Sequence, residues 1–252
     1  MLILFLFLIG TVFGSFYFVA GLRLPKNESI IKPGSHCDEC NKELKWYDLI
    51  PVVSYLINKG RCRYCKTSLS IWYPIVEVST GFLFVISYLL FGISYEFFAG
   101  ILVFSLLVLI FITDFKYYIL LDSPLVISSI SIFLLKYYFF DIRTALLSLL
   151  AGLIMFLIML VVKLFGDHMF KKESLGGGDV KLAFALGVIL GVRLSLVSFV
   201  LSSFLALPYA LGSVYLTQKK EVPFGPFIIS SATIVFVFMD KFTNLLDFFF
   251  LI

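Results

Sequence analysis

Two aspartates mark the ends of apolar segments in a chain that is 61% hydrophobic. Asp114 closes one segment in the run Phe-Ile-Thr-Asp, and Asp179 opens another after Leu-Gly-Gly-Gly. Ionisable groups at membrane depth are costly, so their presence indicates function. Two carboxylates at close range share one proton, because both cannot ionise cheaply. One can then activate water as a general base while its protonated partner polarises a carbonyl, so the pair is predicted to perform aspartic-protease chemistry.

The glycines before Asp179 fit this hypothesis, with Gly176 and Gly178 as supporting residues. Successive glycines leave room for an extended substrate backbone to approach closely. A helix that starts at Asp179 favours negative charge there through its dipole, and Lys181 lowers the local cost of that charge. Taken alone, such a run is more typical of a flexible hinge with an N-capping aspartate. A phosphate-binding loop is not indicated, because neither GxGxxG nor GxxxxGK occurs.

Two further acids lie near apolar segments. Asp122 precedes Ser-Pro, and we expect it to cap the helix that follows. Glu77 lies about one turn into an apolar segment, where it either neutralises a buried Lys or Arg or lines a site. The alternative role for Asp114 is that of an interfacial residue paired with Lys116.

All four cysteines lie in one polar stretch as two CxxC pairs separated by 21 residues, Cys37 with Cys40 and Cys62 with Cys65. Two such chelate loops are typical of a tetrahedral zinc site, and four thiolate ligands make it closed and therefore structural. The alternatives are two disulfides or free buried thiols, and a reducing cytoplasm argues against disulfides. His36 adjoins the first pair, and a solvent-facing loop residue is favoured there over a spare ligand.

The composition indicates an all-α polytopic membrane protein. Of 252 residues only 14% are charged, and the mean hydropathy is +1.05, whereas soluble domains are about 25% charged. Eight apolar segments are candidate membrane spans: 1–21, 74–92, 97–113, 124–140, 144–164, 180–192, 194–216 and 226–240. The first is expected to be a retained helix, because Gly10 and Gly14 suit helix packing better than leader cleavage.

Basic residues cluster in alternate loops. Nine lie within 22–73, Lys163, Lys171 and Lys172 lie in or beside 165–179, and Lys219 and Lys220 lie within 217–225. Cytoplasmic loops are rich in Lys and Arg, so eight spans would put these loops and both aspartates on the cytoplasmic side. The net charge of +4 then reflects topology, and no nucleic-acid partner is expected.

This topology predicts three parts of the chain. The first is a transmembrane helix over 1–21, and the second is a cytoplasmic tetra-cysteine zinc domain over 22–73. The third is a transmembrane aspartyl protease core over 74–252.

Short motifs occur in a characteristic order along the chain. They are Gly14-Ser15-Phe16 with Arg23-Leu24-Pro25, the double CxxC, Trp46-Tyr47-Asp48 with Pro51-Val52-Val53-Ser54, Tyr73-Pro74-Ile75-Val76-Glu77, Asp114 with Asp122, Gly176 to Leu182, and Pro223-Phe224-Gly225-Pro226. In this order they resemble the type IV prepilin leader peptidases, bacterial membrane aspartyl proteases of the GxGD kind. One departure is Leu121, where the family usually has proline, and this loosens the expected turn there.

The resemblance implies removal of a short basic leader from type IV prepilin or pseudopilin precursors, beside the precursor's apolar helix. The cut typically follows a glycine, at the cytoplasmic face of the bacterial plasma membrane. In members with the cysteine domain, the resemblance also implies N-methylation of the new N-terminus with S-adenosylmethionine. The methyl-donor site is not assigned, and Arg23, Glu77 and the segment around Trp46 are candidates only.

Two other classes of protein compete with this interpretation. A proton- or cation-coupled transporter also carries acids on Gly-interrupted helices, although such acids lie near the bilayer midplane and not at its boundary. A zinc-stapled anchoring protein would leave the paired positions of Asp114 and Asp179 without a purpose.

Overall fold

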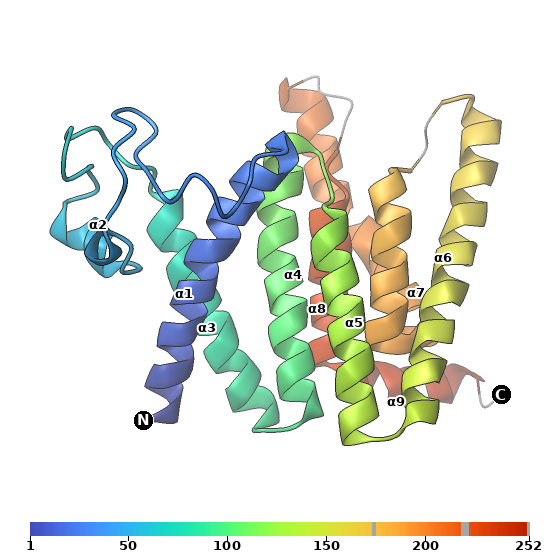
Figure 1. Ribbon diagram of the computed structural model, residues 1–252. Coiled ribbons are helices and arrows are strands. Elements are labelled where there is room, and N and C mark those ends of the chain that lie inside the picture. Colours follow the sequence, from blue (N-terminus) through green and yellow to red (C-terminus); the bar gives the residue numbers. More distant parts are fainter. Residues whose placement is uncertain (173–174, 218–221, 251–252) are drawn as a thin grey trace. The chain divides into compact units, whose positions relative to one another are not determined.

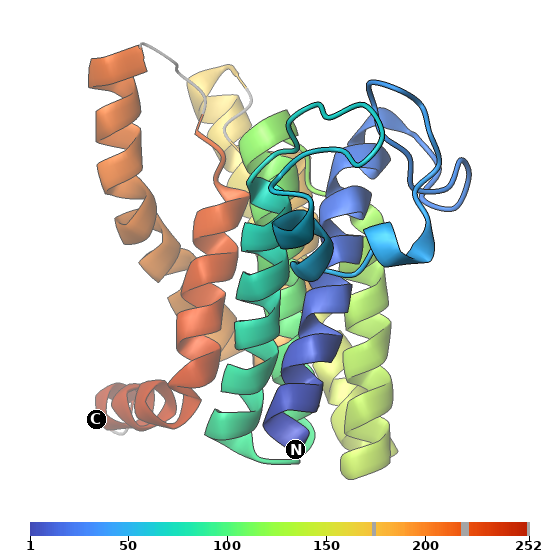
Figure 2. The same ribbon diagram turned by 90° about the vertical axis from the view of Figure 1, so that its left-hand side faces the viewer.

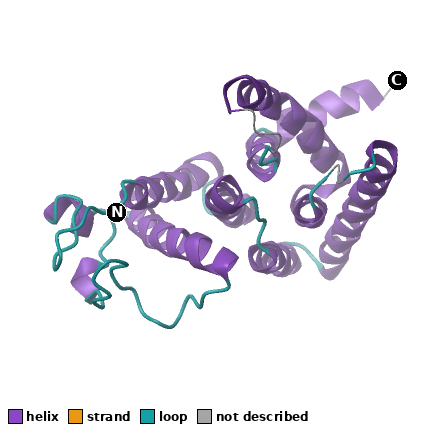
Figure 3. Ribbon diagram, turned by 90° about the horizontal axis from the view of Figure 1, so that it is seen from above, coloured by secondary structure: helices purple, strands orange, loops and turns teal. Residues whose placement is uncertain are grey.

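The structure is a computed structural model that describes residues 1–172, 175–217 and 222–250 (Figure 1). Its helices are α1 (Leu2–Arg23), η1 (Leu24–Lys26), η2 (Trp46–Asp48), α2 (Val53–Ile57), α3 (Trp72–Phe91), α4 (Tyr95–Tyr117), α5 (Asp122–Phe139), α6 (Ile142–Phe170), α7 (Gly177–Thr217), α8 (Gly225–Val237) and α9 (Met239–Phe250). Within the described ranges there is no strand (Figure 3). The predicted all-α class is therefore confirmed. Lys219 and Lys220 lie outside the described residues.

Among the described residues, five helices are long and apolar enough to cross a membrane, or up to six if the bent pair α8 and α9 counts as one span. They are Leu2–Lys26, Trp72–Phe91, Tyr95–Tyr117, Ile142–Phe170 and Gly177–Ser213. The expected number of eight is thus not confirmed. The number found is smaller than the number expected because α5 is not among the five and because α7, which contains a break, counts as one helix.

The chain divides into two compact units, Met1–Ile93 and Ser94–Ile252. In the first unit, α1 and α3 pack with their backbones in contact. A Cβ on Gly10 would lie 2.7 Å from the Cα of Gly81, and one on Gly14 would lie 2.9 Å from the Cα of Glu77. Small residues permit such close approach in membranes, where van der Waals packing drives helix association. The predicted packing role of Gly10 and Gly14 is therefore confirmed.

In the second unit, α6 and the first half of α7 form another close pair (Figure 1). A Cβ on Gly187 would lie 2.7 Å from both the Ala151 carbonyl oxygen and the Cα of Gly152. α6 begins at an N-cap, Asp141, whose Oδ1 accepts a hydrogen bond from the Thr144 N–H at 2.6 Å. An acceptor in this position satisfies an amide that the helix itself leaves unpaired.

A break at Gly191 divides α7 into two helical halves. Gly191 has φ 78° and ψ 171°, a left-handed φ that glycine adopts without steric penalty. Just before it, the Lys136 ammonium of α5 donates a hydrogen bond to the Val188 carbonyl at 2.8 Å. A cation at the end of a half-helix satisfies an unpaired carbonyl and complements the dipole. The expected separate segments 180–192 and 194–216 agree with this break.

After α8 the chain bends by 84° into α9 (Figure 2). We expected one apolar segment over 226–240, but α8 ends at Val237 and α9 starts at Met239. The polar residues Asp240, Asn244 and Asp247 recur about once per turn along α9. This spacing makes α9 amphipathic. Asp247 forms an ion pair at 3.4 Å with Arg193, just beyond the break in α7.

The close contact of α6 with α7 predicts that Gly187→Val lowers stability. The added side chain forces the two backbones apart, and overpacking of this kind costs about 1–3 kcal/mol. Gly212→Val is the matched control on the same helix, because a Cβ there meets nothing within 4 Å. We expect a lower midpoint of thermal unfolding in detergent for Gly187→Val alone. Equal midpoints for the two variants would contradict this packing.

Candidate active site

Asp114 lies in the last turn of α4 with only 6% of its surface exposed. The helix ends at Tyr117, and its C-cap residue, Tyr118, has a left-handed φ of 56°. The Oδ2 atom of Asp114 accepts a hydrogen bond from the Gly225 N–H at 3.0 Å. A Cβ on Gly225 would lie 2.8 Å from that same oxygen, so only glycine permits this contact without a shift. The amide at the start of α8 therefore holds the carboxylate of α4.

Asp179 lies in the first turn of α7 and is 7% exposed. Its N–H donates to the Gly176 carbonyl at 3.1 Å. A Cβ on Gly176 would lie 3.2 Å from Asp179 Oδ2, and one on Gly178 would lie 2.8 Å from the Cβ of Leu120. Both glycines thus make room for the protein's own side chains, whereas nothing lies within 4 Å of a Cβ on Gly177.

The two aspartates come together although 65 positions separate them in the sequence (179 minus 114). They lie close enough for their carboxyl groups to interact electrostatically. Leu120, in the connection from α4 to α5, contacts the Cβ positions of both Gly178 and Gly225. The end of α4 and the starts of α7 and α8 therefore converge on one buried place that contains both carboxyl groups.

Gly225 and Leu120 were not among the predicted site residues. The available signal for Gly225 was the Pro223-Phe224-Gly225-Pro226 motif, in which Pro226 is a residue type typical of the first turn of a helix. Leu120 is one leucine in an apolar chain, and no local pattern distinguishes it.

Lys181 pairs with Asp122 and not with its neighbour Asp179. Its ammonium lies 2.8 Å from Asp122 Oδ1 and 2.7 Å from Oδ2, and both side chains are about half exposed. The expected capping role of Asp122 is wrong. Leu121 occupies the N-cap position of α5 and Asp122 is the first helical residue, with no side-chain cap hydrogen bond. Its carboxylate instead ties the start of α5 to the first turns of α7.

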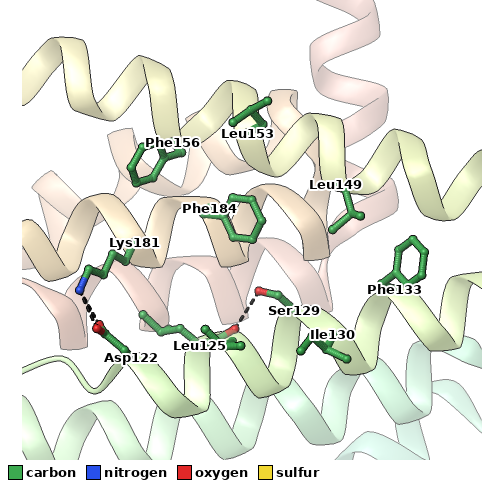
Figure 4. A pocket seen from close by; sticks show the side chains of 11 residues that line it. Asp122, Leu125, Ser129, Ile130, Phe133, Leu149, Leu153, Phe156, Lys181 and Phe184 are labelled. Carbon is green, nitrogen blue, oxygen red and sulfur yellow. Dashed lines mark hydrogen bonds and ion pairs between the residues drawn. The ribbon is translucent and has the colours of Figure 1, made fainter.

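An open groove of about 640 Å³ runs between α5, α6 and α7 (Figure 4). Apolar side chains line it, among them Leu125, Leu153 and Phe184, and the Asp122–Lys181 pair lies at one end. Lys181 follows Asp179 by two positions on α7, so this polar end lies at nearly the same level along α7 as Asp179 but on another face of the helix. From that level the groove runs along the apolar helices.

The four cysteines cluster in the first unit. Their sulfur atoms all lie within 4.8 Å of one another, and the Sγ atoms of Cys37 and Cys65 are 3.7 Å apart. Tetrahedral zinc with Zn–S bonds of about 2.3 Å separates its sulfurs by about 3.8 Å, so this donor set fits the metal. Burial opposes ionisation of the Cys62 thiol, yet the Cys65 and Tyr64 amides and the neighbouring thiols lower its pKa to about 7.

Both CxxC loops have the same backbone design. The amide of the first cysteine donates to Lys42 in one loop and to Thr67 in the other. The residue after each second cysteine, Asn41 or Lys66, has a positive φ and donates to the first cysteine's carbonyl. An isolated antiparallel bridge closes each loop, His36 with Glu43 and Arg61 with Ser68. His36 directs Nδ1 to the Gly34 carbonyl at 2.8 Å, which agrees with its expected place as a loop residue.

Asp48 joins the two halves of this loop and was not predicted. It lies in η2, between the CxxC pairs, and its Oδ1 is 2.8 Å from Arg63 Nε. Its Oδ2 accepts a hydrogen bond from the Tyr64 hydroxyl at 3.1 Å. Both partners lie inside the second CxxC pair, so the ion pair fixes the segment 46–48 against it. The only sequence signal was the Trp46-Tyr47-Asp48 motif.

The candidates for the methyl-donor site make contacts of their own within the first unit. Arg23 donates hydrogen bonds to the carbonyls of Ser29, Pro33 and Gly34. Glu77, which is 6% exposed, accepts from the Val52 N–H at 2.7 Å and from Ser15. Both side chains therefore anchor loop segments to the helices. Trp46 is 76% exposed.

Comparison with known proteins shows which protein family this chain resembles. Residues 8–91 match the Bacterial Peptidase A24 N-terminal domain, and residues 101–211 match the Type IV leader peptidase family. A protein of Bacillus subtilis (strain 168) is 30% identical over 94% of each chain. One of Vibrio cholerae is 33% identical over 91% of this chain and 94% of its own. One of Myxococcus xanthus is 37% identical over 75% of this chain and 56% of its own.

All three relatives bear the name prepilin leader peptidase/N-methyltransferase. No solved structure matches the chain. The apolar helices and these bacterial relatives together indicate a multi-pass bacterial membrane protein. The likeness covers nearly the whole length, and the chain belongs to the type IV leader peptidase family.

Proposed function

We propose that this chain is a membrane aspartyl endopeptidase that removes the leader of type IV prepilin or pseudopilin precursors and methylates the new N-terminus. The observation that carries the proposal is the approach of two buried carboxylates, Asp114 and Asp179, at converging helix ends. The names of the relatives supply the substrate class and the second activity. They give no support to a transporter.

The pair performs hydrolysis with one shared proton. The ionised carboxylate takes a proton from water, whose oxygen bonds to the scissile carbonyl carbon, while the protonated carboxyl donates to the carbonyl oxygen. The tetrahedral intermediate then expels the amine, which leaves with a proton from the pair. Burial of both groups excludes bulk water and strengthens their mutual interaction. The Gly225 amide, at 3.0 Å from Asp114 Oδ2, keeps one member of the pair in place.

The chemistry belongs at the cytoplasmic face of the bacterial plasma membrane. The basic residues of 22–73 and of the α6–α7 connection, including Lys171 and Lys172, support this orientation. It requires eight spans, in which the halves of α7 on each side of Gly191 cross separately. The division into a first helix over 1–21, a zinc domain over 22–73 and a protease core over 74–252 belongs to the same proposal.

Zinc is the proposed metal of the cysteine cluster. Cys37, Cys40, Cys62 and Cys65 would hold it as thiolates, and it would supply folding energy to a segment with few buried side chains. S-adenosylmethionine is the proposed methyl donor and supplies the methyl group. Because Arg23 and Glu77 are engaged in contacts within the first unit, no step of methyl transfer is assigned to them.

The apolar groove supports a substrate that is itself held in the membrane. The groove begins at the level of Asp179 on α7, so an apolar segment bound along α5, α6 and α7 would leave the preceding peptide bond at that level. The groove is lined by apolar residues from its Asp122–Lys181 end onward, so burial of an apolar segment there would contribute affinity. Binding energy from this remote segment positions the scissile bond at the pair.

Asp114→Asn and Asp179→Asn are each expected to lower the rate of leader cleavage by about 100- to 10,000-fold, because each removes a proton-transfer group. Cleavage of a purified precursor in detergent, followed by gel mobility, measures this loss. Asp122→Asn should reduce the rate only in part. Asp247→Asn, which removes an acid from α9, is the control and should be fully active. Full activity of either catalytic variant, folded by its melting curve, would refute the assignment.

Elemental analysis should find one zinc per chain in protein purified without chelator. Cys62→Ser removes a buried thiolate ligand and should lose the metal and lower the unfolding midpoint. His36→Ala should keep one zinc per chain, because the His36 ring is bonded to the Gly34 carbonyl. A metal-free wild-type protein, or unchanged zinc in Cys62→Ser, would count against the site.

Leu153→Trp fills the groove and should raise the KM for a full-length precursor by about tenfold, or about 1.4 kcal/mol. The value of kcat should stay within about twofold, because the pair is untouched. Leu150→Trp is the matched control, since Leu150 lies on α6 but does not line the groove. If both variants raise KM equally, the groove is not the docking site.

A further inference from the structure

The glycine run before Asp179 needs an anchor. Glycine loses more conformational freedom on folding than any other residue, and Gly176, Gly177 and Gly178 directly precede the acid. The hydrogen bond from the Asp179 N–H to the Gly176 carbonyl, at 3.1 Å, holds only the C-terminal end of this run. The N-terminal end, at Leu175, must be held by a contact from another element if the acid is to keep one position.

Lys163 of α6 supplies that contact. Its ammonium donates a hydrogen bond to the Leu175 carbonyl at 2.7 Å. One turn further along α6, Asp167 Oδ2 lies 3.4 Å from the same ammonium, and the two side chains are 17% and 28% exposed. Hydrogen bonds from an ionised donor are shorter and stronger than neutral ones, and partial burial increases their strength. The carbonyl before the glycines is thus tied to a rigid helix.

The same ammonium also acts on the acid itself. Lys163 interacts electrostatically with Asp179, and its charge is opposite in sign to that of Asp114, which also interacts with Asp179. One cation therefore engages both the backbone before the glycine run and the carboxylate after it. Lys181, which is nearer to Asp179 in the sequence than Lys163, forms an ion pair with Asp122 at 2.7 Å.

We propose that Lys163 is a positioning residue for peptide cleavage, which holds the segment from Leu175 to Gly178 so that Asp179 faces Asp114. This inference rests on the proposed function of that pair. The glycine run then acts as a hinge only when the lysine contact is broken. The two interpretations of the Gly-Gly-Gly-Asp sequence, support for a catalytic aspartate and a flexible hinge, are therefore compatible. Lys163 touches neither water nor substrate in this role.

The first test compares kinetics in the full-length chain purified in detergent. Lys163→Met should lower kcat by about 10- to 100-fold, because a displacement of about 1 Å at a catalytic group has effects of that size. KM should stay within about twofold. Lys163→Arg, which keeps the charge and the donor, should restore kcat to within about threefold of wild type. Lys172→Met removes a like charge from the exposed residues that follow α6 and should change nothing.

The second test needs no cleavage. Amide hydrogen exchange in peptides covering 175–182 should be about tenfold faster in Lys163→Met than in wild type or Lys172→Met, because the anchor is lost. If Asp114→Asn keeps full activity, the proposed function fails, but this exchange still reports the anchor.

Two results would overturn the proposal. One is Lys163→Met with kcat within about twofold of wild type and unchanged exchange. The other is a loss of kcat that Lys163→Arg does not restore. If Lys163→Met does not fold, Lys163→Gln replaces it, because Gln keeps a donor without the charge and is judged by the same two measurements.

Discussion

The hydrogen bond between the Gly225 amide and Asp114 Oδ2 is the contact on which the site depends. Buried polar groups in a membrane must find partners inside the protein, and this bond satisfies a helix-start amide and a carboxylate together. It exists because residue 225 has no side chain and because α4 ends where α8 begins. Leu120 fills the space that Gly178 and Gly225 leave. Two glycines and one leucine thus determine how closely three helix ends converge.

The sequence could reveal the acids but not their surroundings. Asp114 and Asp179 were recognisable because acids are rare beside long apolar segments, and the double CxxC identified the cysteine cluster by spacing alone. Gly225 lies 111 positions after Asp114, and Lys163 reaches the glycine run through a backbone carbonyl. Neither contact leaves a local pattern. Tertiary contacts of this kind depend on helix packing that no periodicity encodes.

The errors have physical causes as well. Asp122 was expected to cap a helix, but it stands one position inside α5, where its carboxylate turns to Lys181. The segment 226–240 was expected to be one membrane span, but its last residues belong to an amphipathic helix at 84° to α8. Polar residues spaced at one turn could have separated α9 from α8. The structural role of Asp48 could not be predicted from the sequence, because an ion pair across a loop depends on the fold of both CxxC segments.

The helices that start at the candidate pair are short. The first half of α7 has 14 residues from Gly177 to Leu190, and α8 has 13, which gives each a length of about 20 Å. The hydrocarbon core of a bilayer is about 30 Å thick. On the proposed topology this mismatch thins the membrane beside the pair, as short spans do. On that topology Asp114 and Asp179 lie below the level of the surrounding headgroups, so the hydrolytic reaction would proceed in a local depression of the lipid surface.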